Sequence, residues 1–322
     1  MRRLRSYSLL CLVLTTLVVG CSGKERPIKI FLMEETVPEG QPTYRTLLKV
    51  GEVLKRRTDG RIQFAFLPIG TDVDSSSQIV CMLSMPSING LAEYYRPLGA
   101  LEAPYMFRDI DHFYRAIDSP VGQRLLREAE PRAEQHVLDV WLLGVRQVTL
   151  RDRPATTPDE FGFIKLRVPT ALMAVEVAKV LGALPMTIEF KDVYVNLRAG
   201  TIDGQENPLP TIKTMGFNRL CRYLVLTNHV IATTVPTLSD YHWAKLSPED
   251  RAIVKQAFRD MRIYNRLLID EQERRLVEEL QGEGMVVLRP EIAPFRRRAE
   301  QSWRRFSDVW GDSLVTQIQA AG

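Results

Sequence analysis

The chain has 322 residues, 45% of them hydrophobic and 25% charged, which is enough to build two lobes with separate hydrophobic cores. Its formal net charge is +4, but the first 20 residues hold three arginines and no acid, so the remainder carries 4 − 3 = +1. This balance excludes the clustered basic face that nucleic-acid binding needs. We interpret the one dense arginine cluster, at residues 296–298 and 304–305, as a solvated helix face.

The first predicted element is a secretion signal. An uncharged run from Ser8 to Val19 follows the basic start and is too short to span a bilayer, which takes about 20 apolar residues. The run ends in Leu17-Val18-Val19-Gly20-Cys21, which resembles a bacterial lipobox. That resemblance implies a signal peptide of residues 1–20, a palmitate-type lipid anchor on Cys21, a tether of residues 21–28 and a periplasmic location at a membrane. The alternative is an ordinary signal with an incidental cysteine.

Beyond the leader, strand-like and helix-like segments alternate, which predicts an α/β fold of sheets covered by helices. Period-two or apolar runs predict strands at residues 28–32, 61–68 and 137–143, the last closed by Gly144. Apolar residues at helical spacing predict helices at residues 44–57, 170–181 and 193–198. Residues 162–169 read as a turn, a short strand and a stop at Pro169, whereas residues 203–208 read as a polar loop.

A long helix is predicted near the C-terminus. Ser247-Pro248-Glu249-Asp250 is a strong helix start, because serine caps, proline suits the first helical position and acids complement the N-terminal dipole. The apolar pattern continues to Gly282 and Gly284, which gives roughly 50 Å at 1.5 Å per residue. A helix of this length fits a spine beneath two lobes better than a coiled-coil arm, because its apolar spacing is irregular. A last amphipathic helix is predicted at residues 291–310.

The sequence offers no recognisable catalytic or metal site. It contains no Gly-x-Ser-x-Gly elbow and no glycine-rich phosphate loop, and its four histidines are scattered without metal-ligand spacing. We therefore expect a binding protein with no enzymatic activity, no cofactor and no metal. Cys81 and Cys221 remain outside the leader, and both a disulfide bridge and two buried free thiols are open.

Two side chains lie where a small anion could be bound. Pro169 stops the strand just beyond Arg167, so the guanidinium is expected near a strand end, where open α/β sheets bind ligands. A planar guanidinium binds a carboxylate through two parallel hydrogen bonds, and the Asn207 amide offers both a donor and an acceptor. The alternative for Arg167 is a structural ion pair.

An ordered series of segments gives the chain a family likeness. From about Lys29 to the C-terminus it resembles the DctP-type solute-binding proteins of TRAP transporters, at residues 58–62, 103–109, 144–146, 162–169, 181–183, 192–194, 200–208, 227–229 and 243–249. The resemblance implies two α/β lobes of the periplasmic-binding-protein type with a hinge and a long helix spanning both. It also implies capture of a carboxylate-bearing small molecule between the lobes and its delivery to membrane permease subunits.

The resemblance further implies domain limits and residue roles. Lobe I is expected at residues 29–149 with part of 233–282, and lobe II at residues 150–232 with part of 283–322. Arg167 matches the carboxylate clamp, Arg146 a helping arginine, and Asn207 an amide that holds Arg167 or the ligand. Phe190 matches an aromatic wall residue, with Tyr194 nearby, although both aromatics are equally compatible with the core.

One segment departs from the family pattern. Residues 75–88 lack the usual Gly-x-Ile-Asp-Met-like strand, and Glu34, Glu35 and Asp72 lie where first-lobe contacts could arise. Acids in that place would repel a carboxylate unless they bind hydroxyl or amine groups, so we expect a ligand that is larger or more apolar than a four-carbon dicarboxylate. The departure also motivates an alternative function. The chain would then be a lipoprotein scaffold that kept the fold but binds an apolar ligand or a protein, such as a helical-repeat companion lipoprotein.

Overall fold

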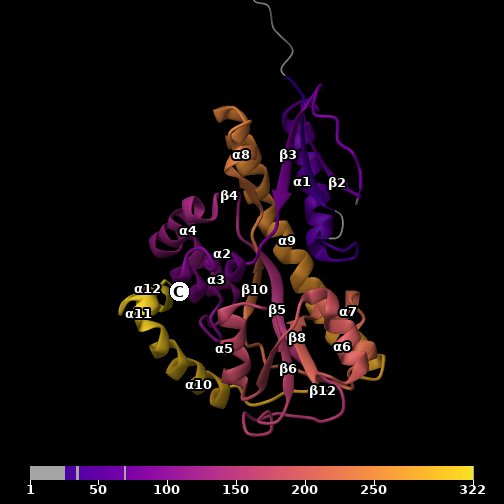
Figure 1. Cartoon of the computed structure of the whole chain (residues 1–322), viewed down its shortest axis with the longest axis vertical. Coiled ribbons are helices and arrows are strands. Elements are labelled where there is room, and N and C mark those ends of the chain that lie inside the picture. The colour runs from indigo at the N-terminus through magenta and orange to yellow at the C-terminus, as the bar shows by residue number, and fades with distance from the viewer. Residues whose placement is uncertain (1–25, 34–35, 69, 322) are drawn as a thin grey trace, which may run out of the picture.

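The computed structural model describes residues 26–33, 36–68 and 70–321, which form two α/β lobes arranged along one long helix (Figure 1). The predicted signal peptide, Cys21 and the acidic pair Glu34 and Glu35 lie outside the described residues. Within the described part of the chain, no helix has both the length and the apolar character that a membrane span requires.

Lobe I, the upper lobe in Figure 1, is built on a five-stranded sheet with the order β2-β1-β3-β11-β4. β1 pairs in parallel with β2 and β3, whereas β11 pairs antiparallel with β3 and β4. The strands are β1 (Ile28–Met33), β2 (Ile62–Leu67), β3 (Ile79–Ser84), β4 (Gln135–Val137) and β11 (Thr237–Ser239). The predictions of strands at residues 28–32 and 61–68 are confirmed. A regular strand, β3, also forms in the segment that departs from the family pattern.

Lobe II is built on a seven-stranded sheet with the order β12-β9-β5-β8-β6-β7, and β10 pairs with β5 beside this path. β6 is parallel to β7 and β8, and β5 is antiparallel to β8, β9 and β10. The strands are β5 (Trp141–Leu150), β6 (Lys165–Val168), β7 (Leu184–Thr187), β8 (Gly204–Pro208), β9 (Tyr223–Val225), β10 (Ile231–Thr234) and β12 (Val286–Leu288). The predicted short strand before Pro169 is therefore confirmed as β6.

Helices cover both sheets, and the predicted helices at residues 44–57, 170–181, 193–198 and 247–282 are confirmed. The α-helices of the described residues are α1 (Pro42–Arg57), α2 (Ile88–Ala92), α3 (Ile110–Asp118), α4 (Pro120–Ala133), α5 (Leu172–Leu181), α6 (Val193–Ala199), α7 (Leu209–Thr214), α8 (Asp240–Trp243), α9 (Pro248–Gly282), α10 (Ala293–Trp303), α11 (Ser307–Trp310) and α12 (Leu314–Ala320). Short 3₁₀ helices lie at Arg96–Glu102 (η2), Phe190–Asp192 (η3), Phe217–Arg219 (η4) and Arg304–Phe306 (η5).

The prediction of a polar loop at residues 203–208 is wrong, because residues 204–208 form the buried strand β8. Polarity misled the prediction, since a run of glutamine, glutamate and asparagine is typical of a solvated turn. Here each of these side chains has a partner. Gln205 donates to Thr149 Oγ1 at 2.8 Å and accepts from Asn207 Nδ2 at 2.5 Å, and Glu206 pairs with Arg146. Paired polar groups are stable in a sheet interior, where unpaired ones are not.

The prediction of a single strand at residues 137–143 is also wrong. β4 ends at Val137 in the lobe I sheet, and β5 begins at Trp141 in the lobe II sheet and continues through Gly144 to Leu150. Residues 138–140 connect the two sheets. β5, which the expected domain division placed in lobe I, pairs with three strands of lobe II, so the chain changes sheets before Trp141 and not after residue 149.

A second crossing between the lobes lies beside the first. β10 of lobe II ends at Thr234 and β11 of lobe I begins at Thr237, with only two residues between them. The crossings are paired in register: Thr234 lies opposite Trp141, Thr237 lies opposite Val137, and Leu138 N donates to Pro236 O at 2.9 Å. The two connections therefore form one short antiparallel ribbon between the lobes.

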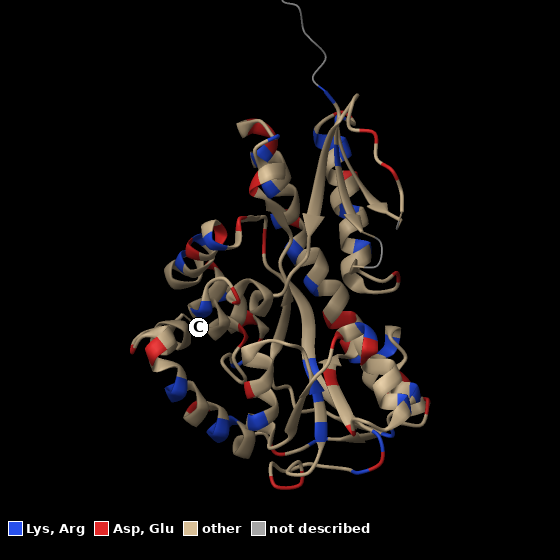
Figure 2. Ribbon diagram, in the orientation of Figure 1, with Lys and Arg blue, Asp and Glu red and all other residues tan. Residues whose placement is uncertain are grey.

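The long helix α9 packs on both lobes, as the sequence predicted. Ser247 caps it by accepting from Asp250 N. Val254, Ala257 and Phe258 belong to the lobe I core, whereas Leu276 and Leu280 belong to a core cluster of lobe II. Near its middle the fully buried Asn265 contacts Thr46 Oγ1 of α1 and donates to Leu142 O of β5 at 2.7 Å. Charged residues of both signs are interspersed along its exposed side (Figure 2).

The C-terminal segment returns from lobe II to the helices of lobe I (Figure 1). On α10, Phe295 and Ala299 pack in the core beneath α5, while Trp310 and Ile318 pack with the helices α3 and α4. The arginines at residues 296–298 are exposed on α10, as the interpretation of a solvated helix face predicted. The predicted helix at residues 291–310 is in fact broken by η5 into α10 and α11.

The two cysteines of the described residues are free and buried, so the alternative of two buried thiols is confirmed over a bridge. Burial raises the pKa of both Cys81 and Cys221 to about 11, which leaves the thiols protonated and unreactive at neutral pH.

A buried ion pair links residues 138–140, which connect the two sheets, to α9. Arg262 donates from Nε to Asp139 Oδ2 at 2.9 Å and from Nη1 to Asp118 Oδ2 at 2.7 Å. The Asp139 side chain is 2% exposed, so it has little access to solvent if the arginine is removed.

We predict that Arg262→Met destabilises the protein by about 3–5 kcal/mol, because Asp139 stays buried without its cation. Urea unfolding measures the change. Arg266→Met is the matched control on the same helix: its partner Asp111 is 60% exposed, so the loss is expected below about 1 kcal/mol. Equal losses in the two variants would contradict the assignment.

A buried carboxyl from α9 contacts β5 at its irregular point. Gly144 has φ +134°, and an added Cβ would lie 2.6 Å from Glu273 Oε1, so the position requires glycine. Glu273 Oε1 accepts from Val145 N at 2.7 Å. Burial raises the pKa of Glu273 to about 7, despite that hydrogen bond.

The raised pKa of Glu273 predicts a specific pH dependence. Between about pH 4.5 and 7 the unfolded chain releases this proton while the folded chain keeps it, so stability falls as pH rises through that window. Glu273→Gln lacks the ionisation, and its stability relative to the unmodified protein should increase by about 1–3 kcal/mol from pH 5 to pH 8. Urea titrations at the two pH values measure the difference, and a constant difference would exclude the proposed protonation.

Candidate functional site

The main candidate site is a cavity of about 620 Å³ between the two lobes, here called the interlobe cavity. Lobe I contributes the segment before and at the start of α1 and the residues after β3. Lobe II contributes the ends of β5, β6 and β8 with η3 and α7. The lining residues are Thr36, Val37, Pro38, Gln41, Thr43, Met85, Ser87, Leu143, Arg146, Arg167, Pro169, Thr170, Glu189, Phe190, Lys191, Asn207, Thr211, Met215, Thr233 and Thr234.

Arg167 is a buried cation without a carboxylate partner. It lies near the end of β6, is 2% exposed, and makes no ion pair with any described residue. Its Nε donates to Ile188 O at 2.7 Å, and its guanidinium lies 5.9 Å from the centre of the Phe190 ring. Burial lowers the pKa of Arg167 to about 10, which leaves it charged at neutral pH. An anion in the cavity would therefore find a charge that the protein has left uncompensated.

Arg146, the second arginine of the cavity, is compensated by the protein itself. It lies on β5 opposite β8 and forms a two-armed ion pair with Glu206, through Nε to Oε2 and through Nη2 to Oε1 at 2.8 Å. Its Nη2 also donates to Glu206 O at 2.7 Å. Burial alone would lower the pKa of Arg146, but the Glu206 carboxylate outweighs it and raises the pKa.

Glu206 is held from two sides. Besides Arg146, it is 3.0 Å from Nε2 of His229, whose Nδ1 lies 2.7 Å from Thr227 Oγ1. Burial opposes ionisation, but the Arg146 charge and the His229 hydrogen bond lower the pKa of Glu206 to about 2. For His229, burial itself lowers the pKa, so the imidazole is neutral and donates from Nε2 to the Glu206 carboxylate. Arg146, Glu206 and His229 form a closed polar unit beneath the cavity floor.

Asn207 contacts Arg146, which is paired with Glu206, and no hydrogen bond joins it to Arg167 in the described part of the chain. Its Oδ1 accepts from Arg146 Nη2 at 3.3 Å, and its Nδ2 donates to Gln205 Oε1. The resemblance implied an amide that holds Arg167 or the ligand. Asn207 hydrogen-bonds Arg146 and lines the cavity, so its contact with a ligand stays a prediction.

The other expected site residues are divided. Phe190, on η3, lines the cavity and is 41% exposed. Tyr194 does not line it and packs in the lobe II core beside α7 and η4. Asp72 is exposed in the loop after β2 and does not line the cavity either. Glu35 and its neighbour Glu34 lie outside the described residues.

Several lining residues were missed by sequence reasoning, because nothing in their local pattern marks them. Thr36 and Thr43 of lobe I, and Thr233 and Thr234 of lobe II, are small polar residues that only the tertiary fold brings together. Thr43 carries the clearest structural signal: its buried Oγ1 has no hydrogen-bond partner among the described residues. A buried hydroxyl without a partner at a cavity wall is expected to meet a ligand or water.

The charges of the described lining residues, taken with Glu206, leave a surplus of one positive charge. Arg146 is neutralised by Glu206 behind it, and Lys191 and Glu189 on the rim have opposite charges. Arg167 remains. This arrangement fits one carboxylate or another monoanion, bound by charge-assisted hydrogen bonds to Arg167.

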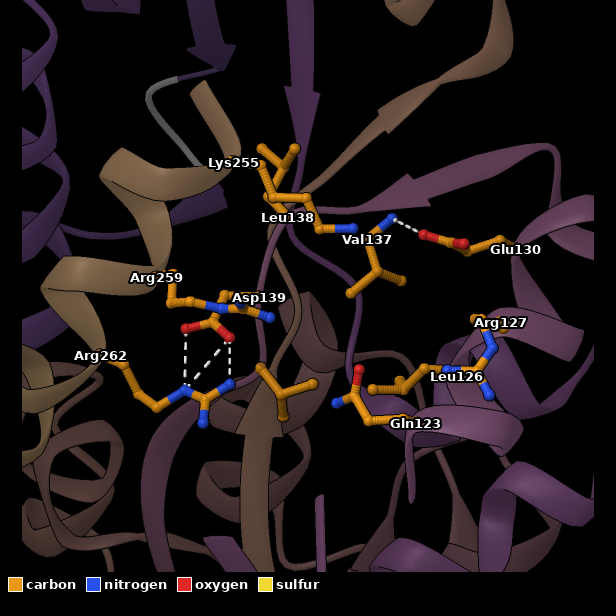
Figure 3. A pocket seen from close by; sticks show the side chains of 11 residues that line it. Gln123, Leu126, Arg127, Glu130, Val137, Leu138, Asp139, Lys255, Arg259 and Arg262 are labelled. Atoms are coloured by element: carbon orange, nitrogen blue, oxygen red, sulfur yellow. Dashed lines mark hydrogen bonds and ion pairs between the residues drawn. The ribbon is translucent and has the colours of Figure 1, made fainter. Parts of the chain in front are cut away.

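A second pocket lies behind the connector between the sheets, among α4, α9 and residues 137–140 (Figure 3). Its volume is only about 50 Å³, and the Asp139–Arg262 ion pair occupies its floor. Arg127, Lys255 and Arg259 on its rim are exposed side chains. The interlobe cavity is therefore the better candidate for a small-molecule site.

The chain is similar to known extracytoplasmic binding proteins. The model of the family described as bacterial extracellular solute-binding protein, family 7 (DctP), matches residues 33–308. The sialic acid-binding periplasmic protein SiaP of Vibrio cholerae is 30% identical over 291 residues, covering 87% of this chain and 89% of that protein. A solute-binding protein of Roseobacter denitrificans is 31% identical over 263 residues, covering 79% of this chain and 80% of that protein.

Solved structures share the fold. A TRAP periplasmic solute-binding protein of Roseobacter denitrificans, with bound L-galactonate, superposes with a TM-score of 0.79 at 26% identity. The match covers 91% of this chain and 99% of that one. One of Actinobacillus succinogenes, with the same ligand, gives a TM-score of 0.81 at 21% identity and covers 91% of this chain and 98% of that one.

We predict that Glu206→Gln destabilises the protein by about 3–5 kcal/mol, because Arg146 is then buried without its carboxylate. Urea unfolding at pH 7 measures the loss. The matched control is Glu279→Gln, which removes one of two carboxylates from the partly exposed Lys213 and should change stability by less than about 1 kcal/mol. A Glu206→Gln variant as stable as the control would show that the ion pair is not needed for the fold.

Proposed function

Because the chain belongs to family 7 of the bacterial extracellular solute-binding proteins, we propose that it is the receptor subunit of a TRAP transporter and binds a carboxylate-bearing small molecule between its two lobes. The family consists of solute-binding receptors and not of enzymes. The resemblance drawn from the ordered sequence motifs is thereby confirmed at the level of the family, together with the two-lobed α/β fold.

The uncompensated guanidinium of Arg167 carries this proposal. A cation that is 2% exposed loses most of its hydration, and no described carboxylate forms an ion pair with it, although Glu206 and Glu189 act on it from a distance. The adjoining Arg146 has a carboxylate partner in the same sheet, so the fold is able to supply one. Leaving Arg167 free at the wall of a cavity is costly for stability and useful for an anion receptor.

The cavity favours a hydroxylated monocarboxylate. Its surplus of one positive charge suits one carboxylate, and threonines at positions 36, 43, 211, 233 and 234 offer hydroxyls for a polar chain. Sialic acid and L-galactonate, named for the relatives in Vibrio and Roseobacter, are both hydroxylated acids with one carboxylate. This class agrees with the sequence-based expectation of a ligand larger than a four-carbon dicarboxylate, but not with the expectation of a more apolar one.

Delivery requires movement and a membrane partner. Closure of the two lobes about the paired ribbon at residues 137–141 and 234–237 would enclose the ligand, as hinge closure does in binding proteins. The closed form would then deliver the ligand to TRAP permease subunits. Lipidation of Cys21 and the tether of residues 21–28 would keep the receptor at the membrane surface in the periplasm, where the permease lies.

The alternative of a scaffold lipoprotein loses its motivation. It was based on the departure from the family pattern at residues 75–88, which suggested a damaged first lobe. In the structure residues 79–84 of this segment form β3, which pairs with β1. Met85 and Ser87, just beyond β3, line the interlobe cavity.

The test replaces Arg167 by methionine, which is similar in length and uncharged. We expect binding of hydroxylated monocarboxylates to fall at least about 100-fold, because charge-assisted hydrogen bonds are lost. We also expect the ligand-free protein to become more stable by about 1–3 kcal/mol, because a desolvated charge is removed.

Calorimetry with N-acetylneuraminate, L-galactonate and succinate, together with urea unfolding, measures both effects. Arg298→Met, at an exposed position on α10, is the control for loss of an arginine. If Arg167 were a structural ion-pair partner, the variant would lose stability and keep its affinity, which would contradict the proposal.

A further inference from the structure

A smaller cavity of about 100 Å³, here called the inner chamber, continues the interlobe cavity behind Arg146. The two spaces adjoin, because five residues line both: Ser87, Leu143, Arg146, Pro169 and Thr233. At roughly 30 Å³ of liquid per water molecule, the chamber has room for a few waters or for a ligand branch of three or four non-hydrogen atoms.

One wall of the inner chamber is acidic. Glu102, at the end of η2, is 4% exposed and makes no ion pair with any described residue. Its Oε1 accepts from Thr233 N at 2.8 Å and from Thr233 Oγ1 at 2.5 Å, and its Oε2 accepts from Asn89 N at 2.9 Å. Glu206 lines the chamber as well, so two carboxyl groups face the single guanidinium of Arg146.

The opposite wall is apolar and made of small side chains. Ala171 directly precedes α5, Ala174 lies in the first turn of α5, and Ala232 comes from β10. Valines at positions 177 and 230 complete the wall. Three alanines leave the space open, because a larger side chain at any of these positions would project into it. The chamber thus combines an apolar wall of small side chains with a wall of carboxyl oxygens.

We propose that the inner chamber is a specificity subsite that receives a short branch of the ligand ending in a hydrogen-bond donor, such as a hydroxyl, an amide N–H or an ammonium, and that it excludes a second carboxylate. This inference rests on the proposed receptor function. Arg167 holds the carboxylate in the interlobe cavity, and the chamber lies on the other side of the Arg146–Glu206 pair.

The exclusion follows from charge and burial. A second carboxylate in the chamber would approach the ionised Glu206 and the carboxyl group of Glu102, whose pKa is raised by burial, while Arg146 is already occupied by Glu206 through two hydrogen bonds. Like charges repel strongly where water is absent, so a dicarboxylate that binds Arg167 with one end has no favourable place here for the other. A donor group meets acceptors instead, and the alanine wall packs against its carbon atoms.

The experiment compares affinities by calorimetry for N-acetylneuraminate, L-galactonate, D-gluconate and succinate, and takes the tightest-binding hydroxylated monocarboxylate as the probe. Ala174→Leu fills the chamber and should weaken the probe at least tenfold. Lys179→Leu adds a leucine on the exposed side of the same helix and should leave its affinity unchanged. An unchanged affinity in Ala174→Leu would overturn the subsite.

A second variant tests the acidic wall without filling the space. Glu102→Gln should raise the ratio of succinate to probe affinity at least tenfold, because an amide N–H, which can donate to a second carboxylate, replaces a carboxyl oxygen. This ratio is insensitive to a general loss of stability, which thermal unfolding monitors separately. A ratio equal to that of the unmodified protein would overturn the exclusion of dicarboxylates.

Arg167→Met separates the two proposals. Loss of probe affinity in Arg167→Met together with unchanged affinity in Ala174→Leu and an unchanged ratio in Glu102→Gln would reject the chamber and keep the receptor function. Probe affinity that does not depend on Arg167, or no binding by any of the four acids, would reject both.

Discussion

The ion pair between Arg146 and Glu206 is the interaction on which the site depends. Two arginines lie at the same cavity, and two buried cations without any anion would repel each other and lose hydration together. β8 supplies one carboxylate for the arginine on the neighbouring strand β5, and His229 fixes that carboxylate from behind. With Arg146 neutralised inside the sheet, Arg167 is the buried arginine of the described lining that has no ion-pair partner. The position of a single glutamate thus distinguishes an ion-paired arginine from an unpaired one.

The sheet interior explains what sequence patterns could and could not predict. Pro169 stops β6 just after Arg167, and this local rule placed the arginine at a strand end, where it lies at the cavity wall. Its role in binding stays a prediction. The same local reasoning failed at β8, because the polarity of residues 205–207 indicates solvent unless the partners Thr149, Arg146 and His229 are known. Those partners are distant in sequence, so local reasoning singled out the Asn207 amide but could not predict that the segment forms a buried strand.

Residues from lobe I were harder to anticipate than those from lobe II. Thr43 and Ser87 line the cavity from the starts of α1 and α2, whereas Asp72, chosen for its charge, is exposed to solvent. Charge is a poor guide where the wall consists of neutral hydroxyls. The long helix was predictable in full, because its cap, its charge pattern and its closing glycines are local features, and its packing on both lobes followed from its length.

The paired crossing of residues 137–141 and 234–237 restricts how the lobes can move. A single connecting strand would let the lobes rotate freely about it. Two strands joined by backbone hydrogen bonds can bend, but they resist twisting of one lobe against the other and sliding of one lobe past the other. Closure of the lobes would therefore be mainly a rotation about this ribbon, which would bring Arg167 closer to the threonines of lobe I. A receptor whose lobes move in this one way would select its ligands by length, because the ligand has to fit the distance between the two cavity walls in the closed form.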